Sequence, residues 1–177
     1  MIKIALCVLL VASSILEAGP TRSISVHTGT LFSDFGGSSV HAGFSQTLYN
    51  YFGGEVSAGY SSRTANINNN DVLYQYADLM LMFNYPLSRH GYNEVSVHLL
   101  GGSMLNVNIA AENAVKNRSN NIHSYLLGME IRGIALSKYV FLEGSVQYSF
   151  SMKDIVVVAG KDIHPSGLIM NVAVRIP

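Results

Sequence analysis

Apolar and polar residues alternate with a period of two in eight separate runs along the chain. Successive side chains of a β-strand point to opposite faces, so this period predicts strands with one apolar face and one polar face. The runs cover residues 24–33, 40–45, 55–61, 77–85, 94–109, 124–132, 140–149 and 168–176. The pattern therefore predicts an all-β fold.

The composition restricts where these apolar faces can be placed. Of the residues, 49% are apolar and only 12% are charged, whereas a soluble domain has about 25% charged residues. After the first twenty residues, no apolar run approaches the length of a transmembrane helix. The 11 basic and 11 acidic residues balance, so no electrostatic argument for nucleic-acid binding arises.

Two all-β architectures fit these strands: a soluble barrel or sandwich, and a membrane barrel that turns its apolar face to lipid. A soluble protein is expected to carry many Lys and Glu residues on its polar face. Here the polar face has no lysine and many Gly, Ser and Asn residues, which suit a narrow closed interior. The sequence thus favours a closed antiparallel eight-stranded transmembrane β-barrel.

The tyrosines are sorted toward the predicted strand ends, with aliphatic residues between them. Such sorting is typical of the aromatic girdles at the two membrane interfaces. The predicted girdle residues are Tyr49, Tyr60, Tyr74, Tyr76, Tyr85, Tyr92, Tyr125, Tyr139 and Tyr148.

The predicted connections alternate in length. Compact connections at 46–53, 86–93 and 134–138 are expected to be short periplasmic turns. Residues 62–73, 110–122 and 151–165 are expected to be longer, polar extracellular loops, while the connection at 36–37 is short.

The N-terminus has the features of an export signal. Lys3 precedes an apolar stretch from Ile4 to Leu16, and Ala18 suits the residue before cleavage. We expect residues 1–18 to be a cleaved signal peptide and residues 19–177 to form the barrel in a bacterial outer membrane. Cys7, the only cysteine, lies in the signal, so the mature chain has no disulfide or thiolate metal site.

Several charged residues have the inward phase of their strands. Carboxylates in such an interior must pair or become protonated. We predict an interior ion-pair network that fills the barrel, formed by Glu55, Glu94, Glu130, Arg132, Glu143 and Arg175. His27, His41 and His98 share this phase, but no short spacing supports a metal site; we expect no metal and no cofactor.

Two segments carry a resemblance to a known group. Residues 76–85 run into a turn, and residues 140–148 repeat the alternation; both resemble the small eight-stranded outer-membrane proteins, namely the OmpX/Ail group, the OmpA membrane domain and OmpW-like proteins. The last strand resembles their assembly signal but ends Val174-Arg175-Ile176-Pro177, without a terminal aromatic residue. The resemblance implies outer-membrane lipid and the barrel-assembly machinery as partners.

The resemblance leaves the function open, because these folds serve several functions. We expect a structural or surface interaction protein of adhesin type, whose loops contact an extracellular ligand. The alternative is a narrow OmpW-like conduit for small apolar molecules. A more remote alternative is a lipid-modifying enzyme, since His164-Pro165-Ser166 resembles the His-x-Ser of lipid A deacylases. No acidic residue follows Asp162, however, and we expect no enzyme activity.

Overall fold

The computed structural model describes residues 22–49, 52–67, 70–87, 95–111, 121–152, 155–156 and 162–176. The predicted signal segment lies outside these ranges. Within them, no helix is long and apolar enough to cross a membrane. The strands are β1 (Arg22–Phe32), β2 (Gly37–Tyr49), β3 (Phe52–Ile67), β4 (Asn70–Pro86), β5 (Ser96–Ala111), β6 (Ile122–Ser137), β7 (Val140–Ser151), β8 (Ile155–Val156), β9 (Asp162–Ile163) and β10 (Gly167–Ile176).

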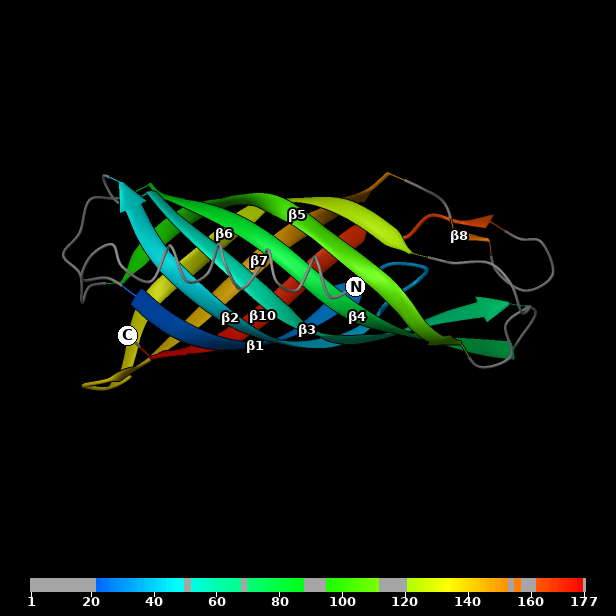
Figure 1. Ribbon diagram of the computed structural model, residues 1–177, viewed down its shortest axis with the longest axis horizontal. Helices are drawn as coiled ribbons and strands as arrows, with labels where there is room; N and C mark the ends of the chain where they lie inside the picture. The colour runs from blue at the N-terminus through cyan, green and yellow to red at the C-terminus, as the bar shows by residue number, and fades with distance from the viewer. Residues whose placement is uncertain are drawn as a thin grey trace, which may run out of the picture.

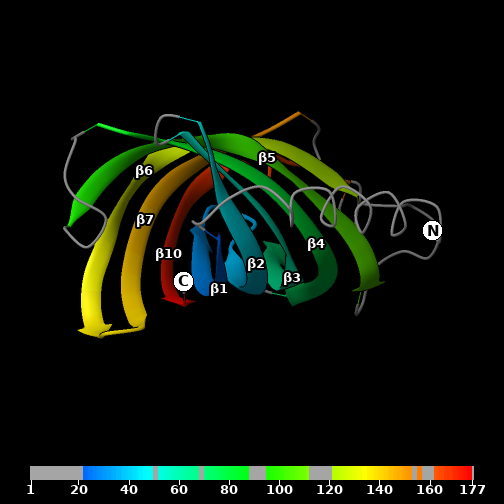
Figure 2. The ribbon, with the colours of Figure 1, turned by 60° about the vertical axis from the view of Figure 1, so that its left-hand side comes forward.

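Eight of these strands close into one antiparallel barrel, in the order β1-β10-β7-β6-β5-β4-β3-β2. The first and last barrel strands close the ring, with Ile24 opposite Ile176 and Phe32 opposite Leu168. Figures 1 and 2 show the strands tilted across the long axis of the molecule. The predicted eight-stranded closed barrel is confirmed.

The barrel has two distinct ends. We call the end with the β2–β3, β4–β5 and β6–β7 connections the turn end, and the opposite end the loop end. The short strands β8 and β9 pair with each other in a separate two-stranded sheet. They lie in the connection from β7 to β10 and therefore belong to the loop end (Figure 1).

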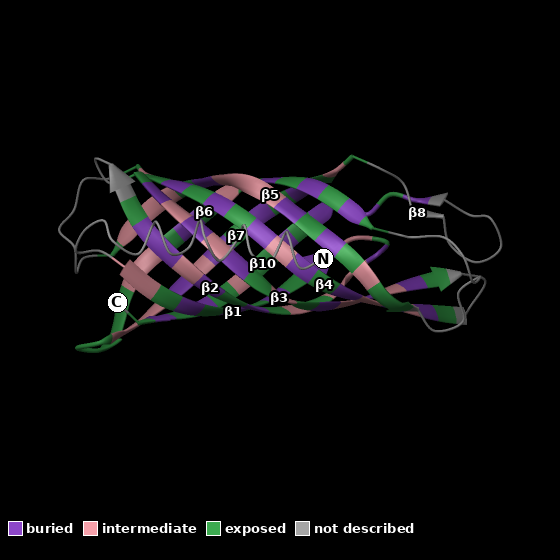
Figure 3. Ribbon diagram, viewed as in Figure 1, coloured by how far each residue is buried: buried purple, intermediate pink, exposed green. Residues whose placement is uncertain are grey.

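Burial alternates along most of the length of the barrel strands, so that inward residues are covered and their neighbours are exposed (Figure 3). The exposed residues are the apolar ones: Ile24 of β1 is 61% exposed and Leu81 of β4 is 42% exposed, whereas Met82 is 5% exposed. Each predicted run has the phase that the sequence indicated. The apolar face thus covers the outside of the barrel, and the polar face lines its interior.

Three predicted connections are shorter than expected. The connection predicted at 46–53 is reduced because β2 continues to Tyr49 and β3 begins at Phe52. Residues 62–73 are mostly strand, since β3 continues to Ile67 and β4 begins at Asn70. The ladder persists there because Ala65 pairs with Val72, and both side chains are buried. At the turn end, β6 continues to Ser137 through a bulge beside Gly133, which has a φ of 86°.

Candidate functional site

The turn half of the interior is organised around Arg175 of β10. Its Nε donates to Glu143 Oε1 at 2.6 Å, and its Nη2 lies 3.2 Å from Glu55 Oε2. Its Nη1 donates to the hydroxyl groups of Ser23 and Ser45. One guanidinium therefore joins β10 to strands β7, β3, β1 and β2, and it stays buried with a polar partner for each nitrogen.

Space for this convergence comes from Gly43 on β2. A Cβ atom at this position would lie 2.6 Å from Glu55 Oε1 and 2.9 Å from Ser25 Oγ. A larger residue would therefore displace the Glu55 carboxylate from Arg175.

A second arginine extends the network. Arg132 Nε contacts Glu130 Oε2, its neighbour on the same face of β6, and lies 3.9 Å from Glu143 Oε1. Glu143 thus lies between the two arginines. The structure brings together five of the six predicted network residues, while Glu94 lies outside the described residues.

Two histidines join the carboxylates, with partners that the sequence did not indicate. His27 Nε2 lies 2.6 Å from Glu55 Oε1 and 2.8 Å from Ser25 Oγ. His41 Nε2 lies 3.0 Å from Asp78 Oδ2. Both rings and both carboxylates are buried, so each pair satisfies polar atoms that water does not reach.

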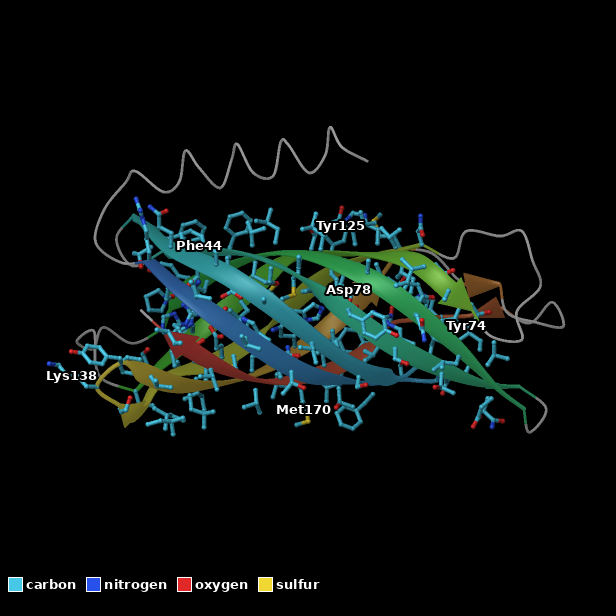
Figure 4. The ribbon with its side chains drawn as sticks, turned by 60° about the horizontal axis from the view of Figure 1, so that its bottom comes forward. Phe44, Tyr74, Asp78, Tyr125, Lys138 and Met170 are labelled. Carbon is cyan, nitrogen blue, oxygen red and sulfur yellow. The ribbon has the colours of Figure 1, made fainter. Side chains whose placement is uncertain are left out.

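A separate polar chain crosses the middle of the barrel, where Figure 4 shows Asp78. Asn106 donates through Nδ2 to Asp78 Oδ1 and accepts through Oδ1 from Arg63 Nη2 at 3.1 Å. The Arg63 guanidinium also lies over the rings of Phe35 and Tyr76, at 5.9 and 5.5 Å from their centroids. Arg63 was not predicted to be an interior residue, because residues 62–73 were expected to be a loop.

Aromatic side chains close the interior at the loop end. Phe35, from the β1–β2 connection, packs edge-on against Tyr74, with ring centroids 5.3 Å apart. Tyr74 and Tyr76 are 1% and 0% exposed, and Ile122 and Ile163 complete the cluster. The assignment of Tyr74 and Tyr76 to a girdle was therefore wrong. Even-numbered residues of β4 point inward, as Figure 4 shows for Tyr74.

Five of the remaining predicted girdle tyrosines face outward. Tyr125, for example, is 50% exposed and points away from the barrel in Figure 4. The side chain of Tyr49 and residue Tyr92 lie outside the described part of the chain. The outward tyrosines are Tyr60, Tyr85, Tyr125, Tyr139 and Tyr148.

The interior holds a cavity of about 30 Å³ between the charged network and the aromatic cluster. Such a volume accommodates about two water molecules, whereas pockets for drug-sized ligands occupy about 300–1,000 Å³. In the described part of the chain, no three His, Cys, Asp or Glu side chains are grouped to hold a metal ion. The described interior is filled by the protein's own side chains.

The His164-Pro165-Ser166 segment is an irregular loop between β9 and β10. The Ser166 hydroxyl accepts a hydrogen bond from the backbone N–H of Ser151 at 2.8 Å, and the Ser166 backbone N–H donates to His164 Nδ1 at 3.4 Å. These contacts fix the loop between β9 and β10.

Three strands continue past their outer neighbours at the loop end. β2 pairs with β3 only as far as Arg63, and β6 pairs with β5 only as far as Asn106. Beyond these points β3, β4 and β5 form a three-stranded extension (Figure 1). On its β5 edge, Val107 and Ile109 are 40% and 56% exposed.

The comparisons bear on the fold. No family model matches the chain, and no curated protein matches it. Among solved structures, the crystal structure of a major outer membrane protein from Thermus thermophilus is similar, with a TM-score of 0.55 and 14% sequence identity. The match covers 88% of this chain and 100% of that chain. The fold is that of an outer-membrane β-barrel.

Proposed function

We propose that the chain is a bacterial outer-membrane barrel that acts at the cell surface as an interaction protein, with no catalytic role. Export by the signal at residues 1–18 and insertion by the barrel-assembly machinery are part of the proposal. The supporting observation is the apolar outer face, which leaves residues such as Leu127 and Val172 at least half exposed. A soluble monomer rarely exposes a continuous apolar surface of this kind to water.

The change of polarity along β3 and β4 supports a surface role for the loop end. In the middle of β4, Leu81 and Phe83 face outward. Nearer the loop end the outward side chain is polar and the inward one is apolar, because Asp71 is exposed and Val72 is buried. A sheet that faces water exposes polar residues, so this reversal supports a position of the extension outside the bilayer.

The observation that carries the surface role is the contrast between a filled interior and an extended rim. Among the described residues, the β5 edge beyond Asn106 has no strand partner, and Asn108 N–H instead donates to Asn121 Oδ1 at 2.9 Å. Asn108 Nδ2 also donates to Ala110 O at 3.2 Å, so an added β-strand would replace these side-chain bonds with backbone bonds along the edge. The proposed ligand is therefore an extended peptide segment of an extracellular protein.

The test compares cells that display the wild-type chain with cells that display the Val107→Lys, Ile109→Lys variant. Charged side chains on an edge oppose strand addition, so adhesion to immobilised extracellular-matrix proteins should fall severalfold. Equal adhesion of both strains at equal surface amounts would contradict the proposal.

The conduit alternative is separated by conductance. We expect the purified barrel to give no discrete current steps in planar lipid bilayers, because the charged network and the aromatic cluster fill its interior. Reproducible single-channel steps would favour the conduit instead.

A further inference from the structure

The β6–β7 hairpin extends past both of its neighbouring strands at the turn end. On one side, β5 begins at Ser96, which lies opposite Arg132 of β6. On the other side, the ladder between β10 and β7 ends where Arg175 lies opposite Phe141. In the described part of the chain, residues 133–140 therefore have no strand neighbour outside the hairpin itself. Figure 1 shows the hairpin projecting from the barrel near the C-terminus.

The apolar residues of β6 change their phase at the base of this hairpin. Before the base they are odd-numbered, as in Met129 and Ile131. Beyond it they are even-numbered, as in Ile134 and Leu136. Because the period of a strand is two, an uninterrupted strand would turn the second pair toward the interior. They would then share a face with Arg132, which contacts the inward Glu130.

The structure avoids this outcome by inserting one extra residue into β6. Ile131 lies opposite Gly144. Three residues later, Ile134 lies opposite Leu142, which is only two residues away from Gly144. Gly133 has a φ of 86°, a left-handed conformation that glycine adopts without steric cost and that a bulge of this kind uses. Ile134 is consequently turned outward and is 40% exposed.

The tip of the hairpin carries residue types that suit a membrane interface. Leu136 and Tyr139 are 59% and 64% exposed. The Tyr139 N–H donates to Ser137 Oγ at 3.3 Å, and the Lys138 ammonium lies over the Tyr139 ring, 5.1 Å from its centroid. Tyrosine rings locate at the level of the lipid headgroups. Lysine keeps its charge among polar groups while its stem stays in apolar surroundings.

We infer that the β6–β7 hairpin is embedded in the phospholipid headgroup layer and anchors the turn end of the barrel there. The bulge makes the hairpin a continuation of the lipid-facing surface, and this continuity identifies lipid as its partner. Leu136 and Tyr139 supply the anchoring contacts, whereas salt and water screen the exposed charge of Lys138. The inference rests on the membrane location in the proposed function, and it adds a specific contact at the end opposite the surface-exposed loops.

The test measures the depth of single tryptophans, because the chain contains none. The full chain is purified from membranes and reconstituted into phosphatidylcholine vesicles that contain a quencher in the acyl chains, a quencher at the headgroup, or iodide on both sides. Leu136→Trp on the hairpin should be quenched most strongly by the headgroup label. Leu81→Trp is the control on the lipid-facing belt and should respond to the acyl-chain label. Asp71→Trp is the exposed control at the loop end and should respond to iodide.

A second change separates the anchor from the preference of the reporter itself. In the Leu136→Trp protein, Tyr139→Asp places a charge on the exposed tip and should increase quenching by iodide severalfold. Tyr139→Phe is the matched control, because it keeps the ring, and it should leave the quenching pattern unchanged. Equal quenching of the Tyr139→Asp and Tyr139→Phe proteins would overturn the anchoring role of the tip.

The depth measurements can overturn the inference in two further ways. Iodide could quench Leu136→Trp as strongly as Asp71→Trp while Leu81→Trp stays protected, which would place the hairpin in water on an intact membrane barrel. Protection of Leu136→Trp from iodide and from both lipid labels would instead show that another copy of the chain covers the hairpin. Exposure of Leu81→Trp to iodide is a separate result, since it would refute the membrane location itself.

Discussion

Replacing Arg175 with alanine tests whether the interior ion pairs stabilise the barrel. The substitution leaves Glu143 and Glu55 without their shared guanidinium, and Glu143 Oε2 already lacks a hydrogen-bond partner among the described residues. Removing one partner of a buried pair costs about 3–5 kcal/mol. Glu55 keeps His27 at 2.6 Å, and Glu143 keeps Arg132 at 3.9 Å. We therefore expect a loss near the lower limit, about 3 kcal/mol in the free energy of unfolding.

The assay is urea unfolding of the barrel in lipid vesicles, followed by far-ultraviolet circular dichroism, because the chain contains no tryptophan. Adding Glu143→Gln to Arg175→Ala removes one orphaned charge and should restore about 1–2 kcal/mol. Lys138→Ala is the control at an exposed turn position and should change the free energy of unfolding by less than about 0.5 kcal/mol. A double variant no more stable than Arg175→Ala alone would refute the pairing of Arg175 with Glu143.

Three further predictions concern the closed barrel and its two faces. A barrel whose ring of strands is closed resists unfolding in mild detergent, so unboiled protein should migrate differently from boiled protein on a denaturing gel; identical migration would contradict the membrane barrel. Leu81→Arg places a charge on the lipid-facing side and should cost about 2–4 kcal/mol at the bilayer midplane. Met82→Arg points inward opposite Glu55 and should cost less; unfolding that shows the reverse order would refute the assigned faces. Phe35→Ala removes a fully buried ring from the loop-end cluster and should lower the free energy of unfolding by about 3–5 kcal/mol, whereas a loss below about 1 kcal/mol would show that this cluster does not seal the barrel.

The sequence was sufficient to predict which face of each strand points to lipid. The period of two is a direct consequence of strand geometry, so residues such as Leu81 and Met82 could be assigned without any knowledge of their neighbours. The same rule was not applied to Tyr74 and Tyr76. They were grouped by their distance from a strand end, although their even numbers place them with the inward Asp78 and Met80.

The loop end could not be predicted from the rule that apolar residues face outward. Toward the loop end, β3 and β4 bury Ala65 and Val72 and expose Asn66 and Asp71. This is the pattern of a strand in water, with a hydrogen bond of 2.7 Å between Asn66 and Asp71. The run of polar residues there predicted a loop. For that reason Arg63 was not predicted to point into the barrel.

Which inward charges meet depends on the stagger between neighbouring strands. The alternation of apolar and polar residues does not specify this stagger. Arg175 and Glu55 are on β10 and β3, with β1 and β2 between them. Whether they meet depends on the stagger between successive strands, which also sets the strand tilt and the diameter of the barrel. A shift of two residues between β1 and β2 would keep every side chain on its face. It would nevertheless move Glu55 about 7 Å along the barrel relative to Arg175, beyond the reach of an ion pair. The contact between Arg175 and Glu55 is therefore specific to the observed stagger, and it opposes slippage that the apolar faces alone would permit.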